Sequence, residues 1–278
     1  MKKVLLLVLT AVLCAPMTYA QKQGNVASAL SNMLTSEKTA NEFLTAVKNG
    51  KVNKVKQMID NATITKTLVN VKDDNGNTPM MWAAKKGYID IVKLLGNAGA
   101  RVNTTNKDNR TALCFAASNN RPQVAEYLLK LNAKVDFACG KNAETPLLLS
   151  AANGANPTMI RIFVNHKANV NATDADQETP LMKVASTKQI DSARTLIKAG
   201  AKVNANTEKG MSPAMKAVFA DNLPMVKFLI ENGGEANAIM SDGVFVYALD
   251  EAQANSSDKM VQYLKSKGYT KPDHQVEY

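Results

Sequence analysis

The sequence is poor in the residues on which catalytic and metal sites depend. Its 278 residues include two histidines, three cysteines and one tryptophan, and aromatic residues make up 5% of the chain. The motifs G-x-S-x-G, H-E-x-x-H and C-x-x-C and the phosphate-binding loop are absent. We therefore expect no enzymatic activity, no cofactor and no metal.

Long hydrophobic runs are also missing. No segment stays apolar for the roughly 20 residues that a membrane-spanning helix needs, so we expect no stable membrane insertion. The apolar run 4–13 follows the basic Met1-Lys2-Lys3 head and precedes the small-residue site Thr18-Tyr19-Ala20. This order predicts a secretory signal peptide, cleaved near Ala20, and export to the periplasm, the cell surface or the medium.

The charge is unbalanced but dispersed. The chain carries 34 basic and 24 acidic residues, and removing the two signal-peptide lysines leaves 32 and 24, a net charge of +8. Such a surplus favours anionic partners or simply keeps the surface solvated. Nucleic-acid binding needs a concentrated basic stripe with stacking aromatics, which this chain lacks, so we expect no nucleic-acid partner.

A motif recurs at a fixed step through the chain. The dipeptide Thr78-Pro79 aligns with Thr111-Ala112, Thr145-Pro146, Thr179-Pro180 and Ser212-Pro213, at spacings of 33, 34, 34 and 33 residues. A regular period of this size indicates stacked modules. A single module cannot bury its own apolar face, so the modules share one continuous core.

Each module has the signals of two helices. In the first, residues 73–77 suit a tight turn, Thr78 can cap a helix that Pro79 begins, and Gly87 ends that helix. A second helix follows, and its apolar stripe is Ile91, Val92, Leu94 and Leu95. The corresponding first-helix stops are Asn120, Gly154, Lys188 and Asp221, of which only Lys188 departs from residues that tolerate left-handed geometry.

The TPxxxAA start, the glycine stop, the aliphatic second helix and the GAxVN exit resemble the ankyrin repeat. The resemblance implies an all-α solenoid of stacked helix-turn-helix units with short β-hairpin or loop fingers. The family's TPLH signature has histidine at its fourth position, where this chain has Met81, Cys114, Leu148, Met182 and Met215. We therefore expect apolar packing in place of the imidazole hydrogen bond. Packed helices lie about 8–10 Å apart, which is too far for these sulfurs to share a metal ion.

The signal-peptide pattern and the resemblance together divide the chain as follows. The parts are a signal peptide (1–20), a leader (21–40), an ankyrin-repeat domain (41–269) and a tail (270–278). Within the domain are an N-terminal cap (41–72), five repeats (73–106, 107–140, 141–174, 175–208 and 209–242) and a C-terminal cap (243–269). In the C-terminal cap, Val244, Val246, Ala248 and Leu249 are assigned to a first helix.

The cysteines are expected to be free. Cys14 lies in the signal peptide. The alternative that Cys14 is the lipidated cysteine of a bacterial lipoprotein is disfavoured, because Leu13 before it is bulky where a lipoprotein signal has a small residue. Cys114 is placed in a helix and Cys139 in the following finger. We expect their Cα atoms to lie outside the ~4.4–6.8 Å that a disulfide requires.

Ankyrin proteins generally hold partners with finger tips and the exposed ends of first helices. Carried over, this rule selects Asp74, Asn75, Asn77, Trp82, Lys85, Lys86, Lys107, Arg110, Lys141, Glu144, Asp176, Glu178, Glu208, Lys209 and Phe219. Their charge changes from basic to acidic along the chain, which favours a partner with the opposite gradient. Trp82 is either a binding anchor or a cover for the seam after the N-terminal cap.

These observations favour an exported, non-enzymatic, monomeric protein-protein interaction scaffold that binds a partner protein through its concave groove. An alternative with the same fold is an inhibitor or immunity-type protein that blocks a secreted enzyme or toxin. A cell-wall polysaccharide binder or an enzyme needs clustered carboxylates or an aromatic platform. The predicted groove residues provide neither.

Overall fold

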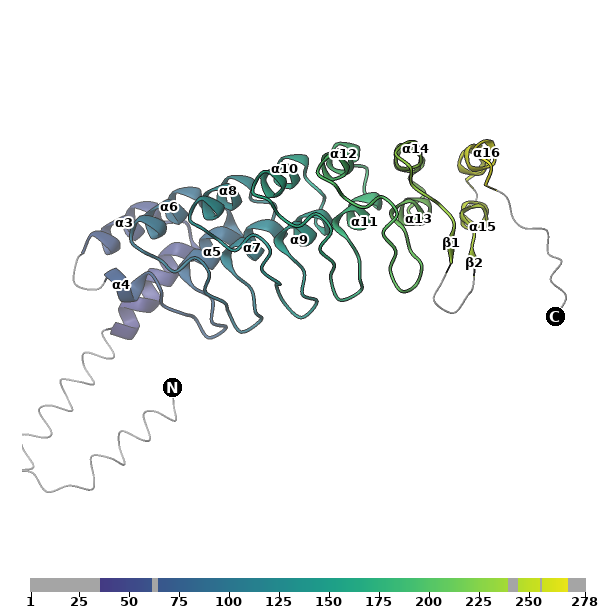
Figure 1. Cartoon of the computed structure of the whole chain (residues 1–278). Helices are drawn as coiled ribbons and strands as arrows, with labels where there is room; N and C mark the ends of the chain where they lie inside the picture. The colour runs from purple at the N-terminus through teal and green to yellow at the C-terminus, as the bar shows by residue number, and fades with distance from the viewer. Residues whose placement is uncertain (1–35, 62–64, 240–244, 256, 270–278) are drawn as a thin grey trace, which may run out of the picture. The chain divides into compact units, whose positions relative to one another are not determined.

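The computed structural model describes residues 36–61, 65–239, 245–255 and 257–269 (Figure 1). The predicted signal peptide, most of the leader and the tail lie outside the described residues. Contacts divide the chain into residues 1–45 and 46–278. In the first unit, residues 36–45 are helical and belong to a helix over 36–48, so this helix already includes part of the predicted leader.

The second unit consists of helix pairs. They are α5 (Pro79–Lys86) and α6 (Ile89–Asn97), α7 (Ala112–Ser118) and α8 (Pro122–Lys130), α9 (Pro146–Ala152) and α10 (Pro157–Asn165), α11 (Pro180–Ala185) and α12 (Ile190–Lys198), α13 (Pro213–Phe219) and α14 (Leu223–Glu231), and α15 (Ala248–Ala254) and α16 (Asp258–Ser266). Before these pairs, α3 (Val52–Asp60) lies in the row of second helices, where it contacts α6, and the short helix α4 (Thr65–Leu68) follows it. From α5 to α15 each first helix contacts the next, and the second helices form a parallel row. The predicted all-α solenoid is confirmed, and no described helix is long and apolar enough to cross a membrane.

The first helices begin where the caps predicted. Thr78, Thr111, Thr145, Thr179 and Ser212 each accept a hydrogen bond from the backbone N–H three residues later, at 3.2–3.3 Å. The expectation that apolar packing alone replaces the histidine was wrong in three repeats. The sulfurs of Met81, Cys114 and Met182 lie 3.2–3.4 Å from the backbone N–H of the capping residue and act as weak acceptors.

The stops of the first helices follow the predicted rule. Gly87, Asn120, Gly154 and Asp221 have positive φ, between 47° and 94°, whereas Lys188 is not among the residues with positive φ. The fourth repeat turns differently, because the Thr187 hydroxyl donates to the Val184 carbonyl at 2.8 Å and accepts from the Gln189 amide at 3.2 Å. A threonine turn thus replaces the left-handed residue there.

The core runs between the two rows of helices. The fourth-position residues Met81, Cys114, Leu148, Met182 and Met215 are at most 1% exposed. Ile91, Val92 and Leu95 of the second-helix stripe are fully buried, whereas Leu94 is partly exposed. The small Ala83 and Ala84 are also fully buried, which lets neighbouring helices approach closely. The sulfur-rich column is therefore part of the core.

The described part of the C-terminal cap begins with a strand instead of a helix, and this strand pairs with one at the end of the fifth repeat. The strands β1 (Ala238–Ile239) and β2 (Phe245–Val246) are antiparallel, with Ala238 opposite Val246. The assignment of Val246 to the first helix was therefore wrong, and Val244 lies outside the described residues. Ala248 and Leu249 do open α15 and are buried. The β-branched Val246 continues the last finger as a strand, and the helix starts two residues later.

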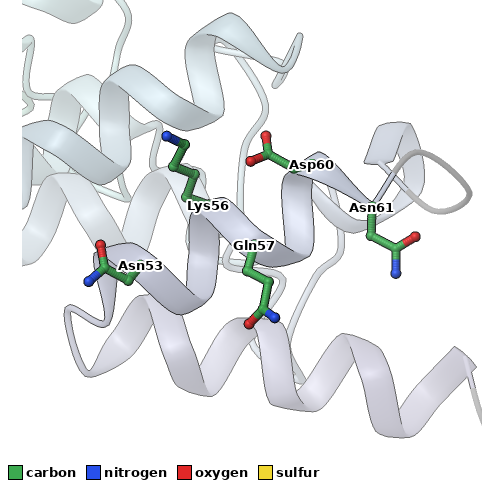
Figure 2. A pocket seen from close by; sticks show the side chains of 5 residues that line it. All are labelled: Asn53, Lys56, Gln57, Asp60 and Asn61. Atoms are coloured by element: carbon green, nitrogen blue, oxygen red, sulfur yellow. The ribbon is translucent and has the colours of Figure 1, made fainter.

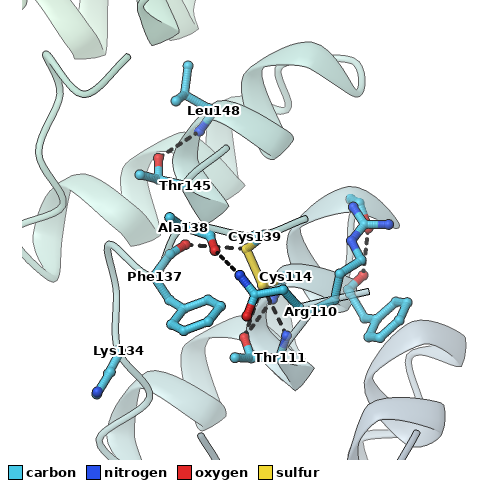
Figure 3. Close-up of a disulfide and its surroundings, with 12 residues drawn as sticks. Arg110, Thr111, Cys114, Lys134, Phe137, Ala138, Cys139, Thr145 and Leu148 are labelled. Carbon is cyan, nitrogen blue, oxygen red and sulfur yellow. Dashed lines mark hydrogen bonds between the residues drawn. A yellow bond between two sulfur atoms is a disulfide. The ribbon is translucent and has the colours of Figure 1, made fainter. Parts of the chain in front are cut away.

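The prediction of free thiols was also wrong. Cys114 and Cys139 form a disulfide with their Cα atoms 6.2 Å apart (Figure 3). Cys114 lies in the first turn of α7, next to the fingers, and the following finger folds back because the Cys139 amide donates to the Glu144 carbonyl at 2.9 Å. This return brings Cys139, which is 2% exposed, against the start of α7.

Candidate functional site

The predicted partner-binding residues lie on the fingers and on the first helices. Exposed members are Asp74, Asn75, Lys85, Lys86, Lys107, Lys141, Asp176, Glu208, Lys209 and Phe219, and partly exposed members are Trp82, Arg110, Glu144 and Glu178. These positions are open to a partner molecule. They fall on different repeats, and the structure brings only some of them together.

Asn77 is the exception among the predicted site residues. It is only 9% exposed, and its side-chain oxygen accepts a hydrogen bond from the Asn106 amide at 2.8 Å. Its own amide lies 3.4 Å from Asp73 Oδ2. Asn77 therefore links two neighbouring fingers, and its polar groups are used inside the fold.

Trp82 is held in place by hydrogen bonding and by cations. Its indole N–H donates to Asp73 Oδ2 at 2.8 Å. The Lys48 ammonium lies 4.6 Å from the centre of the ring and 3.5 Å from the same carboxylate oxygen. The Lys85 ammonium lies 5.3 Å from the ring centre. Both distances are within the range of cation–π attraction, so the ring is fixed at its edge and faced by two cations.

Phe115 extends this arrangement into the next repeat. The Lys85 ammonium lies 5.8 Å from the Phe115 ring centre, and the Arg110 guanidinium lies 5.4 Å from it. A shallow pocket opens between the two repeats, lined by Asn77, Met81, Trp82, Lys85 and Phe115. Five residues, Lys48, Trp82, Lys85, Arg110 and Phe115, thus form one surface, which we call the cationic aromatic shelf.

The sequence analysis missed Phe115 and Lys48. A signal for Phe115 was present, because it lies 33 residues after Trp82 and occupies the same helix position. Continued through the later repeats, this column reads Trp82, Phe115, Leu149, Lys183 and Lys216. The column therefore changes from aromatic in the first two repeats to lysine in the last two. No comparable periodic signal marks Lys48.

The two lysines at the C-terminal end of the column are neutralised by ion pairs. The Lys183 ammonium lies 2.7 Å from Asp174 Oδ2 and 2.6 Å from Glu178 Oε2. Lys216 pairs with the other oxygen of Glu178. Asp174 occupies the finger position of Asp73, and each carboxylate accepts a bond from the column residue that follows it by nine positions. Glu178, which the sequence offered as an acidic contact, is thus already engaged by two lysines.

The finger carboxylates also hold their own turns. Asp73 Oδ1 accepts from the amides of Asn75 and Asn77 at 3.0 and 2.9 Å. Asp174 Oδ1 accepts from the amides of Asp176 and Glu178 at the same distances. The same carboxylate therefore fixes the finger and orients the column side chain, which makes both sites rigid.

These contacts shift the protonation equilibria of three groups. Burial alone raises the pKa of Asp73, but hydrogen bonds from Trp82 and Asn77 and the Lys48 charge outweigh burial and lower it. Burial likewise opposes the ionised forms of Glu178 and Lys183. Their mutual pairing prevails, so the pKa of Glu178 is lowered and that of Lys183 is raised. All three groups are charged at neutral pH.

Two further observations concern chemistry elsewhere. Among the described residues, no group of three or more histidine, cysteine, aspartate or glutamate side chains could hold a metal ion. An open polar hollow lies on α3, lined by Asn53, Lys56, Gln57, Asp60 and Asn61 (Figure 2). Four of its residues lie on this one helix and Asn61 directly follows it, so the hollow lacks the convergent groups of a ligand site.

Comparisons with known proteins find ankyrin repeats in the chain. A family profile described as ankyrin repeats (3 copies) matches residues 43–139 and 134–207. An ankyrin repeat protein of Rickettsia bellii is 26% identical over 187 residues, which is 58% of this chain and 27% of that protein. The fowlpox virus ankyrin repeat protein FPV031 is 35% identical over 112 residues, 38% of this chain and 32% of that protein. The chain thus spans about a third or less of these relatives.

A solved structure is similar over more of its length. It is a chain in the complex of the predatory endopeptidase Bd0816 of Bdellovibrio bacteriovorus with the immunity protein Bd3460. The identity is 32% and the TM-score 0.60, and the match covers 68% of this chain and 96% of that chain.

Proposed function

The chain belongs to the ankyrin-repeat family, and from this premise we propose that it binds a partner protein through its fingers and first helices without catalysing a reaction. Ankyrin repeats imply protein-protein interaction. The observation that carries the proposal is the cationic aromatic shelf, where the partly exposed Trp82 and the exposed Lys85 lie on α5, and Phe115 lies on α7 of the next repeat. Tryptophan and arginine are enriched in the residues that dominate binding energy at protein interfaces.

The finer proposal is that the chain acts as an immunity-type inhibitor of an exported peptidase. Its support is the similarity to the structure of an endopeptidase in complex with an immunity protein. Two features of the chain support export: the signal-peptide pattern of residues 1–20 and the Cys114–Cys139 disulfide. Disulfides form and persist in oxidising compartments such as the periplasm.

The proposal can be tested by capture from the organism's own periplasmic and secreted fractions, with the mature chain from Gln21 as bait. The captured protein is then assayed for peptidase activity, with and without the bait. We expect one exported protein to be retained and its activity to fall on binding. Retention of cell-wall polymer without protein would refute the proposal, and a retained protein with unchanged activity would leave only the scaffold function.

A variant pair shows whether capture depends on the proposed surface. The variant Lys85→Glu, Lys86→Glu, Arg110→Glu is expected to lose the captured protein. The control, Lys54→Glu, Lys93→Glu, Lys198→Glu, makes the same charge change at exposed positions on the second-helix row. We expect the control to retain the partner, because its substitutions lie away from the fingers and first helices.

A further inference from the structure

We infer that the cationic aromatic shelf is an anchoring site for an acidic segment of the partner protein, with a carboxylate received between Lys85 and Arg110 above the Phe115 ring. This inference rests on the proposed function, since it names the chemistry of the partner at that same surface. Four observations carry it: the rigidity of the rings, the unpaired cations, the covered ring faces and the contrast with the other end of the column.

The shelf is held in shape before any partner arrives. The indole of Trp82 is fixed by its bond to Asp73, and that carboxylate is fixed in turn by two backbone amides of its finger. Phe115 is 8% exposed, so its ring is largely buried where it lines the pocket. A preorganised surface loses little conformational entropy on binding.

The cations of the shelf are in excess over its carboxylates. Asp73 forms an ion pair with Lys48 and accepts a hydrogen bond from Trp82. Within the described part of the chain, no carboxylate oxygen lies within 4 Å of the Lys85 ammonium or the Arg110 guanidinium. Even Asp108, two residues before Arg110, forms no ion pair with it. These two cations are therefore available to an external acidic group.

The faces of the Trp82 and Phe115 rings are covered by cations, and this favours one kind of ligand over others. Lys48 and Lys85 lie over Trp82, while Lys85 and Arg110 lie over Phe115. Nucleobases and sugars bind aromatic surfaces by stacking on open ring faces, and here cations lie over both rings. A carboxylate needs no ring face, and the planar guanidinium of Arg110 can bond both of its oxygens. The geometry thus favours an aspartate or glutamate side chain.

The opposite end of the column gives an internal comparison. There the cations Lys183 and Lys216 are matched by Asp174 and Glu178 in one ion-pair network. Both ends therefore place cations on the first helices, but only the shelf leaves cations without carboxylate partners. An acidic segment is thus drawn to the first two repeats, and its docking position is fixed there.

Trp82 supplies a direct probe, because it is the only tryptophan of the chain. The mature protein is titrated at low ionic strength with a synthetic acetylated decapeptide of aspartate and glutamate, and its tryptophan fluorescence is followed. The same peptide with asparagine and glutamine in place of the acids is the control ligand. We expect a saturable fluorescence change with the acidic peptide only, and weaker binding as salt is added.

Two matched variants locate the binding. Lys85→Gln with Arg110→Gln is expected to weaken the acidic peptide about tenfold or more, because both available cations are lost. Lys93→Gln with Lys198→Gln removes the same charge from the second-helix row and is expected to change affinity less than about twofold. Thermal melting of both variants checks that the fold is retained.

Several results overturn the inference. These are no fluorescence change with the acidic peptide, an equal change with the amide peptide, or equal weakening in the two variants. An oligonucleotide of the same charge that binds more tightly through Lys85 and Arg110 also overturns it. A captured partner that is indifferent to Lys85→Gln with Arg110→Gln refutes the inference and leaves the proposed function standing. If the acidic peptide binds at the shelf but no exported protein is captured, the proposed function is refuted and the binding of acidic segments at the shelf is retained.

Discussion

The effect of the disulfide on stability can be predicted quantitatively. Cys114 and Cys139 are separated by 25 residues. A crosslink that closes a loop of that length lowers the conformational entropy of the unfolded chain and so raises its free energy by about 3.5 kcal/mol. Reduction is therefore expected to lower the free energy of unfolding by about 2–4 kcal/mol. For a domain of this size, each kcal/mol shifts the melting temperature by roughly 2–4 °C. The expected loss on reduction is thus about 5–15 °C.

The assay compares the oxidised and the reduced mature chain in thermal and urea unfolding followed by circular dichroism. The matched control is Cys114→Ala with Cys139→Ala, which should melt near the reduced protein and should not respond to reductant. Alanine is preferred to serine because both positions are buried, and a buried hydroxyl without a partner would add its own cost. The reasoning is refuted if the purified oxidised protein has two titratable thiols, or if reductant leaves its unfolding curve unchanged.

Three further predictions concern the column and the fingers. Trp82→Phe keeps an aromatic ring but loses the bond to Asp73, and should cost about 1 kcal/mol in urea unfolding; no cost would mean that this bond contributes nothing in solution. Because the pKa of Glu178 is lowered, its stabilisation is complete above about pH 4.5 and is lost as the pH falls through the lowered value. Because the pKa of Lys183 is raised, its stabilisation is complete below about pH 10.5 and is lost as the pH rises through the raised value. Urea unfolding across pH should show both losses, and Glu178→Gln should flatten the acid-side loss; an unaltered acid limb contradicts the network. Ala143 has a φ of 53° at a finger tip, so Ala143→Gly should stabilise the chain by about 0.5–1 kcal/mol, and a lower melting temperature would contradict this.

The helix register could be predicted from the sequence because its signals are local. A capping hydroxyl followed by proline sets the start of a helix, and glycine, asparagine or aspartate sets its stop. Thr78, Pro79 and Gly87 behave as these rules predict. The one departure, Lys188, was visible in the sequence, but the threonine turn that replaces its role was not.

The sequence did not reveal features that depend on packing between repeats. The disulfide arises because one finger folds back against the preceding helix, which spacing alone does not show. The strand pairing of Val246 depends on the partner strand across the last finger. The sulfur acceptors need the side chain to turn back toward its own cap, and the residue type does not fix that rotamer.

The candidate site was predicted in outline only. Trp82, Lys85 and Arg110 were selected by their repeat positions. In the structure Trp82 and Lys85 line one pocket with Phe115, and the Arg110 guanidinium lies over the Phe115 ring. The acidic end was described too simply, since Glu178 is paired with two lysines. Charge counted along a sequence does not reveal which charges neutralise each other, because pairing depends on how neighbouring repeats meet.

The most direct test of the proposed function is the activity of the captured exported protein, measured as the mature chain is added in increasing amounts. The proposal predicts that peptidase activity falls to the background level near one chain per partner molecule. It also predicts that the variant Lys85→Glu, Lys86→Glu, Arg110→Glu fails to inhibit at the same concentration. Full activity in the presence of excess wild-type chain, or equal inhibition by that variant, would contradict it.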